Sequence, residues 1–449
     1  MSTVIARTIQ TPDNSPVSFP NGIMIGRATG AGTVNNIGTA GQQGFGVGIA
    51  PSIPANFAAL YGTTDPASDA YGNYQYSDGS IMVYVPAFYY KYGTGANGFA
   101  LNVVDVKPFS YYADVATANA AGYALHRAFY NGGTIRPGFF VDKYYCSKTG
   151  SGTASSVKNG IPLASALRGG LAGTNFASLT GAPADTFAGT IAAAKTRGST
   201  FFPMARYQRA ALALLANAHG SAASGTTYCA WYSSGSTNFP KGCNNNALGD
   251  TNDATLAFLD DGTATNCCKT GSANFFSKTT HNGQNCGVAD LNGTIYGIEP
   301  FGLTSNGSNF FVLKTSVDVT TITASNTLAT DCWGATGLAA MYTDLGTTYQ
   351  SLTASSTNKI FGAAAQVLSE DASGNAWLFA GNGLPLTAGV GGSNQFGNDG
   401  MYDYRTNECC VHSGGSWAGA AAAGVWCVNL AGSRSDSAGD CGFRSASYL

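Results

Sequence analysis

Apolar residues occur along the chain in short blocks separated by glycine-rich, polar stretches. Residues 81–92 and 138–145 combine β-branched and aromatic side chains over lengths typical of strands. Pro86 lies inside the first block, and because proline cannot donate a hydrogen bond to a neighbouring strand, we expect an edge or a bulge there. Residues 295–298 and 425–430 have the same character. The pattern therefore predicts several short strands.

Three segments have helical patterns. Residues 113–125 and 186–197 are helix-prone, the first of them rich in alanine, and residues 204–219 place most of their apolar side chains on one side of a helix. Gly220 predicts the end of the third helix. Strands together with a few helices indicate an α+β fold.

The chain also divides by composition. Residues 1–75 are rich in glycine, alanine, threonine and asparagine and contain only short apolar patches, so we interpret them as a structural or assembly segment. Residues 76–449 form the main predicted domain. Within it, residues 221–285 contain four cysteines and little periodicity, which is typical of an elaborated or functional loop inserted in a compact domain.

Residues 414–444 combine large apolar anchors with small or polar residues whose removal would cost the core little stability. A glycine pair at 414–415 opens a turn, and Trp417 follows it as an anchor. Residues 432–440 are almost entirely small or polar, so we expect this loop to face solvent and to bind a partner. The alternative is a hairpin that merely closes the core, and we favour that role for the large aromatic residues of the region.

Composition and charge narrow the possible functions. Only 10% of the residues are charged, the formal net charge is −2 and the isoelectric point is about 6.1. The chain therefore lacks the overall positive charge that would attract the phosphate backbone of a nucleic acid. Nucleic acid is not an expected partner. The N-terminus lacks a signal-peptide pattern and no segment approaches about 20 consecutive apolar residues. We therefore expect a chain made in the cytoplasm that does not insert into a membrane.

No motif for catalysis or metal binding stands out. The eleven cysteines are an odd number, so they cannot all pair internally, and Cys-x-x-Cys spacings are absent. We favour buried free thiols over structural disulfides, although a few could oxidise outside a cell. None of the four histidines lies in a His-Glu-x-x-His pattern, and glutamate is scarce. We assign no catalytic residue, no cofactor and no metal.

Several motifs, taken in order, resemble one protein family. They are Gly-Phe-Phe-Val-Asp-Lys-Tyr at 138–144, Asp-Leu-Asn-Gly at 290–293, Gly-Gly-Ser-Trp at 414–417, Ala-Gly-Val-Trp at 423–426 and Gly-Phe-Arg-Ser-Ala at 442–446. The chain resembles phage tail receptor-binding proteins with a C-type lectin-like domain of the formylglycine-generating-enzyme (sulfatase-modifying) subtype. This group includes the major tropism determinant and other variable proteins of diversity-generating retroelements. Positions Thr294, Tyr296 and Gly297 depart from the family motif.

The resemblance implies a fold and a site. The fold would be C-type lectin-like, with small antiparallel sheets, two or more flanking helices and long irregular loops, after a small glycine-rich N-terminal β or irregular segment. The framework of the site would be Gly414, Gly415, Trp417, Gly424, Arg434, Gly442, Phe443 and Arg444. The receptor-binding positions would be Ala418, Gly419, Ala421, Ala422, Cys427, Asn429, Ala431, Gly432, Asp436, Ala438, Gly439 and Asp440. Because most of these are alanine or glycine, we expect modest affinity per site.

The implied function is that of a phage tail fibre or tail tip adhesin. Residues 1–75 would attach it to other tail proteins of the virion, and the domain would bind a glycan or an outer-membrane protein of the host as a homotrimer. One alternative is an enzyme, either a formylglycine-generating oxidase or a surface-glycan depolymerase. That oxidase uses a closely spaced cysteine pair to hold copper, whereas Cys427 and Cys441 are fourteen residues apart. The other alternative is a structural tail or baseplate component.

Overall fold

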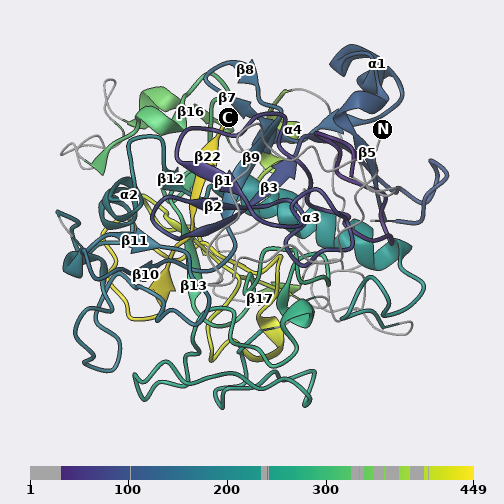
Figure 1. Cartoon of the computed structure of the whole chain (residues 1–449). Helices are drawn as coiled ribbons and strands as arrows, with labels where there is room; N and C mark the ends of the chain where they lie inside the picture. The colour runs from purple at the N-terminus through teal and green to yellow at the C-terminus, as the bar shows by residue number, and fades with distance from the viewer. Residues whose placement is uncertain are drawn as a thin grey trace, which may run out of the picture. The chain divides into compact units, whose positions relative to one another are not determined.

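A computed structural model describes most of the chain (Figure 1). The described residues are 32–101, 103–179, 181–233, 240, 242–324, 333, 338–346, 358–360, 374–384, 399–402 and 404–449. The chain divides into Met1–Ala31 and a compact unit, Gly32–Leu449, and everything below concerns the second. The predicted boundary near residue 75 does not coincide with this division, because residues before it form strands of the first sheet. The virion-attachment role of residues 1–75 stays a prediction.

The first sheet has six antiparallel strands. In spatial order these are β1 (Phe57–Ala59), β2 (Asn73–Tyr76), β3 (Ile81–Pro86), β9 (Gly138–Asp142), β22 (Ser445–Tyr448) and β12 (Phe202–Pro203). All five residues of β9 are buried, as expected for a continuous apolar run inside a protein. The last strand of the chain lies between β9 and β12, so the end of the terminal region is an interior strand of the first sheet.

The second sheet carries most of the terminal region. Its six strands are, in spatial order, β17 (Asn358–Ile360), β18 (Gly400–Tyr402), β20 (Val428–Asn429), β19 (Val411–Ser413), β13 (Tyr296–Glu299) and β21 (Cys441–Gly442). The pairs β18–β20 and β13–β21 are parallel and the others antiparallel. The strand predicted at 425–430 is thus shorter than expected, since only two of its residues form β20.

Smaller sheets complete the β-structure. One contains β5 (Val104–Pro108), β4 (Phe88–Tyr92) and β6 (Ala124–Leu125), and another β14 (Leu303–Ser305), β15 (Phe310–Leu313) and β16 (Tyr342–Asp344). Two hairpins are β7 (Tyr130–Asn131) with β8 (Thr134–Ile135), and β10 (Ser147–Lys148) with β11 (Ala154–Ser155). The block at 81–92 forms β3 and β4, which belong to different sheets. The predicted edge or bulge at Pro86 is wrong, because β3 lies between β2 and β9 and Pro86 is in register with Gly138. The proline is instead the last residue of its strand, and the chain leaves the first sheet directly after it.

The helices are few and mostly short. They are α1 (Val115–Ala120), α2 (Ala188–Lys195), α3 (Arg206–Ala222) and α4 (Gly374–Ala380). The 3-10 turns are η1 (Phe109–Tyr111), η2 (Arg127–Phe129), η3 (Phe176–Ser178), η4 (Phe276–Thr279), η5 (Val319–Thr321), η7 (Leu338–Met341) and η8 (Ala420–Ala422). The predicted end of the third helix at Gly220 is wrong, because α3 continues through it to Ala222. His219 helps to hold this last turn by contacting Gly41 and the carbonyl oxygen of Tyr228.

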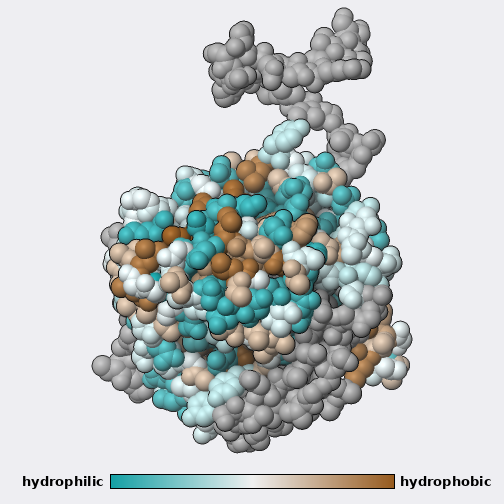
Figure 2. Space-filling model, turned by 90° about the horizontal axis from the view of Figure 1, so that it is seen from below, coloured by the Kyte–Doolittle hydropathy of each residue, from teal (hydrophilic) through white to brown (hydrophobic). Residues whose placement is uncertain are grey.

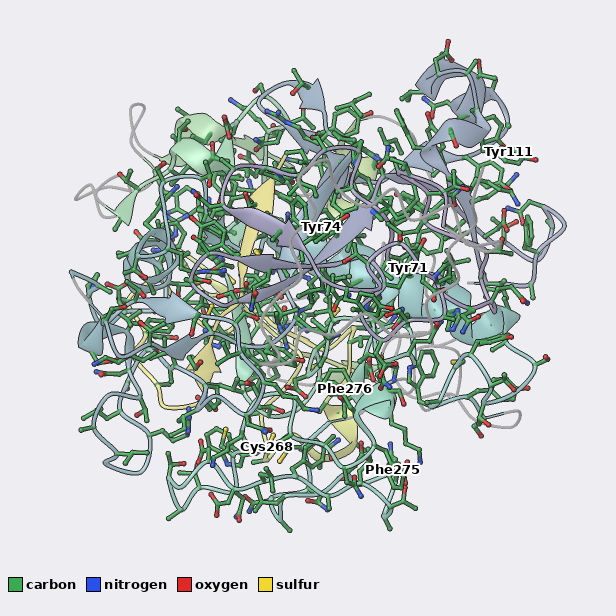
Figure 3. All side chains as sticks on the ribbon, viewed as in Figure 1. Tyr71, Tyr74, Tyr111, Cys268, Phe275 and Phe276 are labelled. Carbon is green, nitrogen blue, oxygen red and sulfur yellow. The ribbon has the colours of Figure 1, made fainter. Side chains whose placement is uncertain are left out.

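The described part of residues 223–285, which we call the irregular lobe, contains little regular structure, and much of it extends along the lower edge of Figure 1. Their small core includes Cys243, Leu256, Phe258 and Cys268. Figure 3 shows Phe275 at the edge of this lobe, where its side chain is exposed, and Phe276 closer to the main body. Seen from below, this face mixes hydrophilic and apolar residues (Figure 2).

A buried ion network joins α3 to the second sheet. The Arg209 Nε donates a short hydrogen bond to Glu299 Oε1, and Arg206 Nη1 lies 3.6 Å from Glu299 Oε2. The Ser413 hydroxyl donates to the same carboxylate at 2.6 Å. All three charged side chains are fully buried. Charge-assisted hydrogen bonds therefore hold β13 and β19 against the longest described helix.

The structure confirms a mixed α+β protein with several small antiparallel sheets and few helices. Within the described residues, none of the helices combines the length and the apolar character that a bilayer span requires.

Candidate functional site

The glycine turn at Gly414 and Gly415 anchors the terminal region. Both residues have positive φ, 88° and 84°, a conformation that glycine adopts without strain. A Cβ atom on Gly414 would lie 2.6 Å from the Leu291 carbonyl oxygen. The Gly414 N–H donates to the Cys427 carbonyl oxygen, and the Gly293 N–H donates to the Gly414 carbonyl oxygen. The turn therefore ties the Asp-Leu-Asn-Gly segment to the terminal region.

The large framework residues lie inside the molecule. Phe443 is fully buried and packs edge-on against Phe176 at 5.3 Å between ring centroids. The Arg444 guanidinium lies 4.1 Å from the centre of the Tyr145 ring. It also donates to the main-chain carbonyl oxygens of Asp142, Lys143, Ala289 and Asp290. These side chains hold the terminal region in place from within, whereas Trp417 is only half-buried.

The twelve predicted receptor-binding positions differ in exposure. The exposed residues are Ala418 and Ala421, and the half-buried ones are Gly419, Ala422, Asn429, Ala431, Asp436, Ala438, Gly439 and Asp440. The buried ones are Cys427 and Gly432. A Cβ atom on Gly432 would lie 2.4 Å from His412 Nε2. Gly432 is therefore packed against His412, and its contact with a receptor stays a prediction.

The prediction that residues 432–440 face solvent is also largely wrong. The Thr186 N–H donates to the Asp436 carbonyl oxygen at 2.9 Å, and Arg168 Nη1 donates to the Gly439 carbonyl oxygen at 3.1 Å. Only two serines of this loop are exposed. Polar composition does not reveal that distant segments will satisfy the carbonyl groups of a loop.

Four of the predicted positions share one hollow, which we call the terminal pocket. Its volume is about 280 Å³. It is lined by Tyr296, Gly400, Tyr402, Gly419, Ala422, Cys427, Val428 and Asn429. The pocket gathers residues from β13, β18, η8 and β20, so the second sheet and the turn after Trp417 build it together. The remaining predicted positions do not line this pocket.

Sequence reasoning missed Tyr296 and Tyr402 as wall residues. Tyr296 drew attention only as a departure from the family motif, and nothing in the sequence around Tyr402 marks it. The sequence cannot show that β18 and β20 run parallel with Tyr402 opposite Asn429.

The polar groups of the terminal pocket are neutral. Burial raises the pKa of Tyr296, which also hydrogen-bonds with the Asn429 side chain, so its phenol stays protonated at neutral pH. Asn429 Oδ1 accepts a hydrogen bond from the Ala431 N–H at 2.8 Å. None of the described residues that line this pocket has a charged side chain. Two phenols, an amide and small residues suit an uncharged polar ligand that has an apolar face.

The thiols and imidazoles near the pocket are buried. The ten described cysteines are buried and no disulfide joins any two of them, and Cys332 lies outside the described residues. Cys441 Sγ lies 3.8 Å from His412 Nδ1, but burial raises the pKa of this thiol well above its usual value. In the part of the chain that the structure describes, no group of three or more His, Cys, Asp or Glu side chains is placed to hold a metal ion.

No protein-family model matches this chain, and no curated protein is significantly similar to it. A function for this chain therefore has to be inferred from the geometry of the terminal pocket.

Proposed function

We propose that this chain is a phage tail fibre or tail tip adhesin that binds a receptor on the bacterial surface, either a glycan or an outer-membrane protein. The observation that carries the proposal is the terminal pocket, whose wall contains Gly419, Ala422, Cys427 and Asn429. These four positions were selected from the resemblance alone, and they meet in one accessible hollow. The proposal includes a C-type lectin-like fold for the domain, and no reaction.

The roles of the framework support this proposal. The Gly293 N–H donates to the Gly414 carbonyl oxygen, so two segments that carry the resemblance are joined directly. Phe443 and Arg444 are fully buried, so they can hold the terminal region in place without touching a ligand. A rigid wall of small residues limits the entropy cost of binding but also limits the contact area.

If each pocket binds with modest affinity, several copies of the protein in one assembly would raise the overall affinity for a cell surface. We propose a homotrimer attached to the virion through residues 1–75 and other tail proteins, after synthesis in the host cytoplasm. Simultaneous engagement of neighbouring receptors would then give avidity beyond that of one pocket.

Adhesion to bacterial cells tests the proposal. The fluorescently labelled protein should bind cells of a susceptible strain, and Asn429→Trp should reduce binding at least tenfold because the indole fills the pocket. The matched control is Ala96→Trp, which places the same side chain at an exposed position between β4 and β5, apart from the predicted receptor-binding positions. Equal thermal unfolding of the three proteins would show that folding is unchanged. Adhesion of Asn429→Trp equal to that of the control would place the contact elsewhere, and adhesion to no strain would reject the adhesin.

The enzyme alternative has its own readout. Incubation of the purified protein with surface polysaccharide from the bound strain should leave the length of the polysaccharide chains unchanged. Progressive shortening would show a depolymerase instead.

A further inference from the structure

A second hollow lies beside the terminal pocket, on the other side of the η8 turn. Residues 244–251 form its outer wall, and we call it the asparagine-loop pocket. Its volume is about 780 Å³. It is lined by Asn244, Asn245, Asn246, Ala247, Leu248, Gly249, Asp250, Thr251, Ala254, Leu256, Ala257, Ala418 and Ala420. The sequence resemblance assigns no role to residues 244–257.

Hydrogen bonds fix this loop against the terminal region. The Asn246 N–H donates to the Trp417 carbonyl oxygen at 2.8 Å, and the Ala420 N–H donates to the Asn244 carbonyl oxygen at 2.8 Å. The Asn244 side chain is fully buried and bonds to the Ala420 carbonyl oxygen and to the Thr251 N–H. The second pocket is therefore built into the fold.

The turn at residues 418–422 contributes to both pockets, and we call it the ridge. Ala418 and Ala420 line the asparagine-loop pocket, and Gly419 and Ala422 line the terminal pocket. None of these four residues carries a side chain larger than a methyl group. A ligand that fills one pocket can continue over the ridge into the other.

The polar groups in the second pocket also suit an uncharged ligand. Asn245 and Asn246 are exposed, and among the described residues neither side-chain NH₂ group donates a hydrogen bond within the loop. Each amide can therefore donate to a ligand. Among the described residues that line the two pockets, Asp250 is the one that carries a charge. This near absence of charge disfavours phosphorylated or strongly anionic ligands.

We propose that the two pockets together bind one neutral oligosaccharide that crosses the ridge. Sugar rings carry hydroxyl groups that match the amides of Asn245 and Asn246, and apolar C–H faces that match the rings of Tyr296 and Tyr402. The terminal pocket alone lies just below the usual range of small-molecule sites, about 300–1,000 Å³, so an extended ligand uses both hollows. This inference rests on the proposed adhesin function and specifies its receptor as a glycan.

The first test separates a glycan from a protein receptor on cells that the wild-type protein binds. Mild periodate, which cleaves vicinal diols, should reduce adhesion at least tenfold, whereas proteinase K should leave it unchanged. The reverse pattern would overturn the glycan while leaving the adhesin function intact. Failure of the wild-type protein to adhere to any strain would reject the adhesin function itself.

The second test addresses the ridge. The probes are oligosaccharides of graded length, released by mild acid from the surface polysaccharide of the bound strain. Affinity measured by calorimetry should rise about tenfold from two to four sugar units. Ala418→Trp should remove that gain, whereas Ala96→Trp should not. Both positions are exposed, but Ala96, in the connection between β4 and β5, lines neither pocket and is not a predicted receptor-binding position, so it is the matched control. An unchanged length dependence in Ala418→Trp would overturn the crossing of the ridge.

Discussion

Ala420 and Asn244 hydrogen-bond to each other twice, although 176 residues separate them in the sequence. The Ala420 N–H donates to the Asn244 carbonyl oxygen, and Asn244 Nδ2 donates to the Ala420 carbonyl oxygen. The terminal region is therefore part of a composite structure that includes the irregular lobe. A ligand bound at the ridge would contact both the terminal region and the irregular lobe.

Removing the Asn244 side chain should loosen the ridge. Asn244→Ala leaves the Ala420 carbonyl oxygen and the Thr251 N–H without their partner, which we expect to lower the free energy of unfolding by about 1–3 kcal/mol. Urea denaturation measures the change, and cell adhesion should fall with it. Thr251→Ala, at an exposed position of the same loop, keeps the backbone N–H that Asn244 accepts from and should change stability by less than about 0.5 kcal/mol. Equal stability of the two variants would contradict the role given to Asn244.

The sequence predicted the parts of the fold that depend on local pattern. The aromatic block that begins at Gly138 forms β9, and residues 204–219 lie almost entirely in α3. The burial of Phe443 also follows from its size and apolar character. In each case the hydrophobic effect acts on residues whose pattern is visible in a short window.

Features that depend on distant partners could not be predicted. The loop at 432–440 is held by Thr186 and Arg168, and the asparagine-loop pocket exists because Asn246 meets Trp417. Tertiary contacts also carry α3 past Gly220, where helix propensity alone favours an end. Such contacts are set by the topology of the chain, and no window of sequence contains both partners.

The buried carboxylate of Glu299 should be important for stability. Glu299→Gln removes the negative charge that faces Arg209 and Arg206, and leaves two buried cations without compensation. We expect a loss of about 3–5 kcal/mol in the free energy of unfolding. The partly exposed pair of Lys107 and Asp105 provides a control, since Lys107→Gln should cost less than about 1 kcal/mol. Similar unfolding midpoints for the two variants would show that the buried network contributes little.

Two buried histidines should make the protein less stable in mild acid. Burial lowers the pKa of His281 to about 4 and that of His126 to about 3. Their usual pKa is about 6.5, so below that pH the unfolded chain binds protons that the folded protein does not. The contribution of these neutral histidines to the free energy of unfolding is fully present above pH 6.5, and it is lost as the pH falls toward 4.

Urea denaturation between pH 7.5 and 5 measures this slope. In His281→Gln the free energy of unfolding should depend less on pH across that window, even if the variant is less stable at every pH. The glutamine amide replaces a ring that accepts from the Val288 N–H and contacts the Gly46 carbonyl oxygen. An unchanged slope would show that His281 becomes protonated in the folded protein.

Thiol labelling should report access to the terminal pocket. Burial suppresses the reactive thiolate at most cysteines, for example by raising the pKa of Cys409 to about 12. Cys427 is 7% exposed and lies in the pocket wall. In a Cys332→Ser background, which leaves only described cysteines, we expect Cys427 to react first with a small aromatic disulfide reagent. The other nine should react at the rate of unfolding.

Cys427→Ser is the control, because it should remove the early label and leave the slow ones. Asn429→Trp should slow the labelling of Cys427, since the indole would occupy the space through which the reagent approaches the sulfur. Peptide mass spectrometry identifies the labelled residue. If the early label falls on another cysteine, or if Asn429→Trp leaves the rate unchanged, the hollow is closed in solution. Neither the adhesin proposal nor the glycan inference could then rest on it.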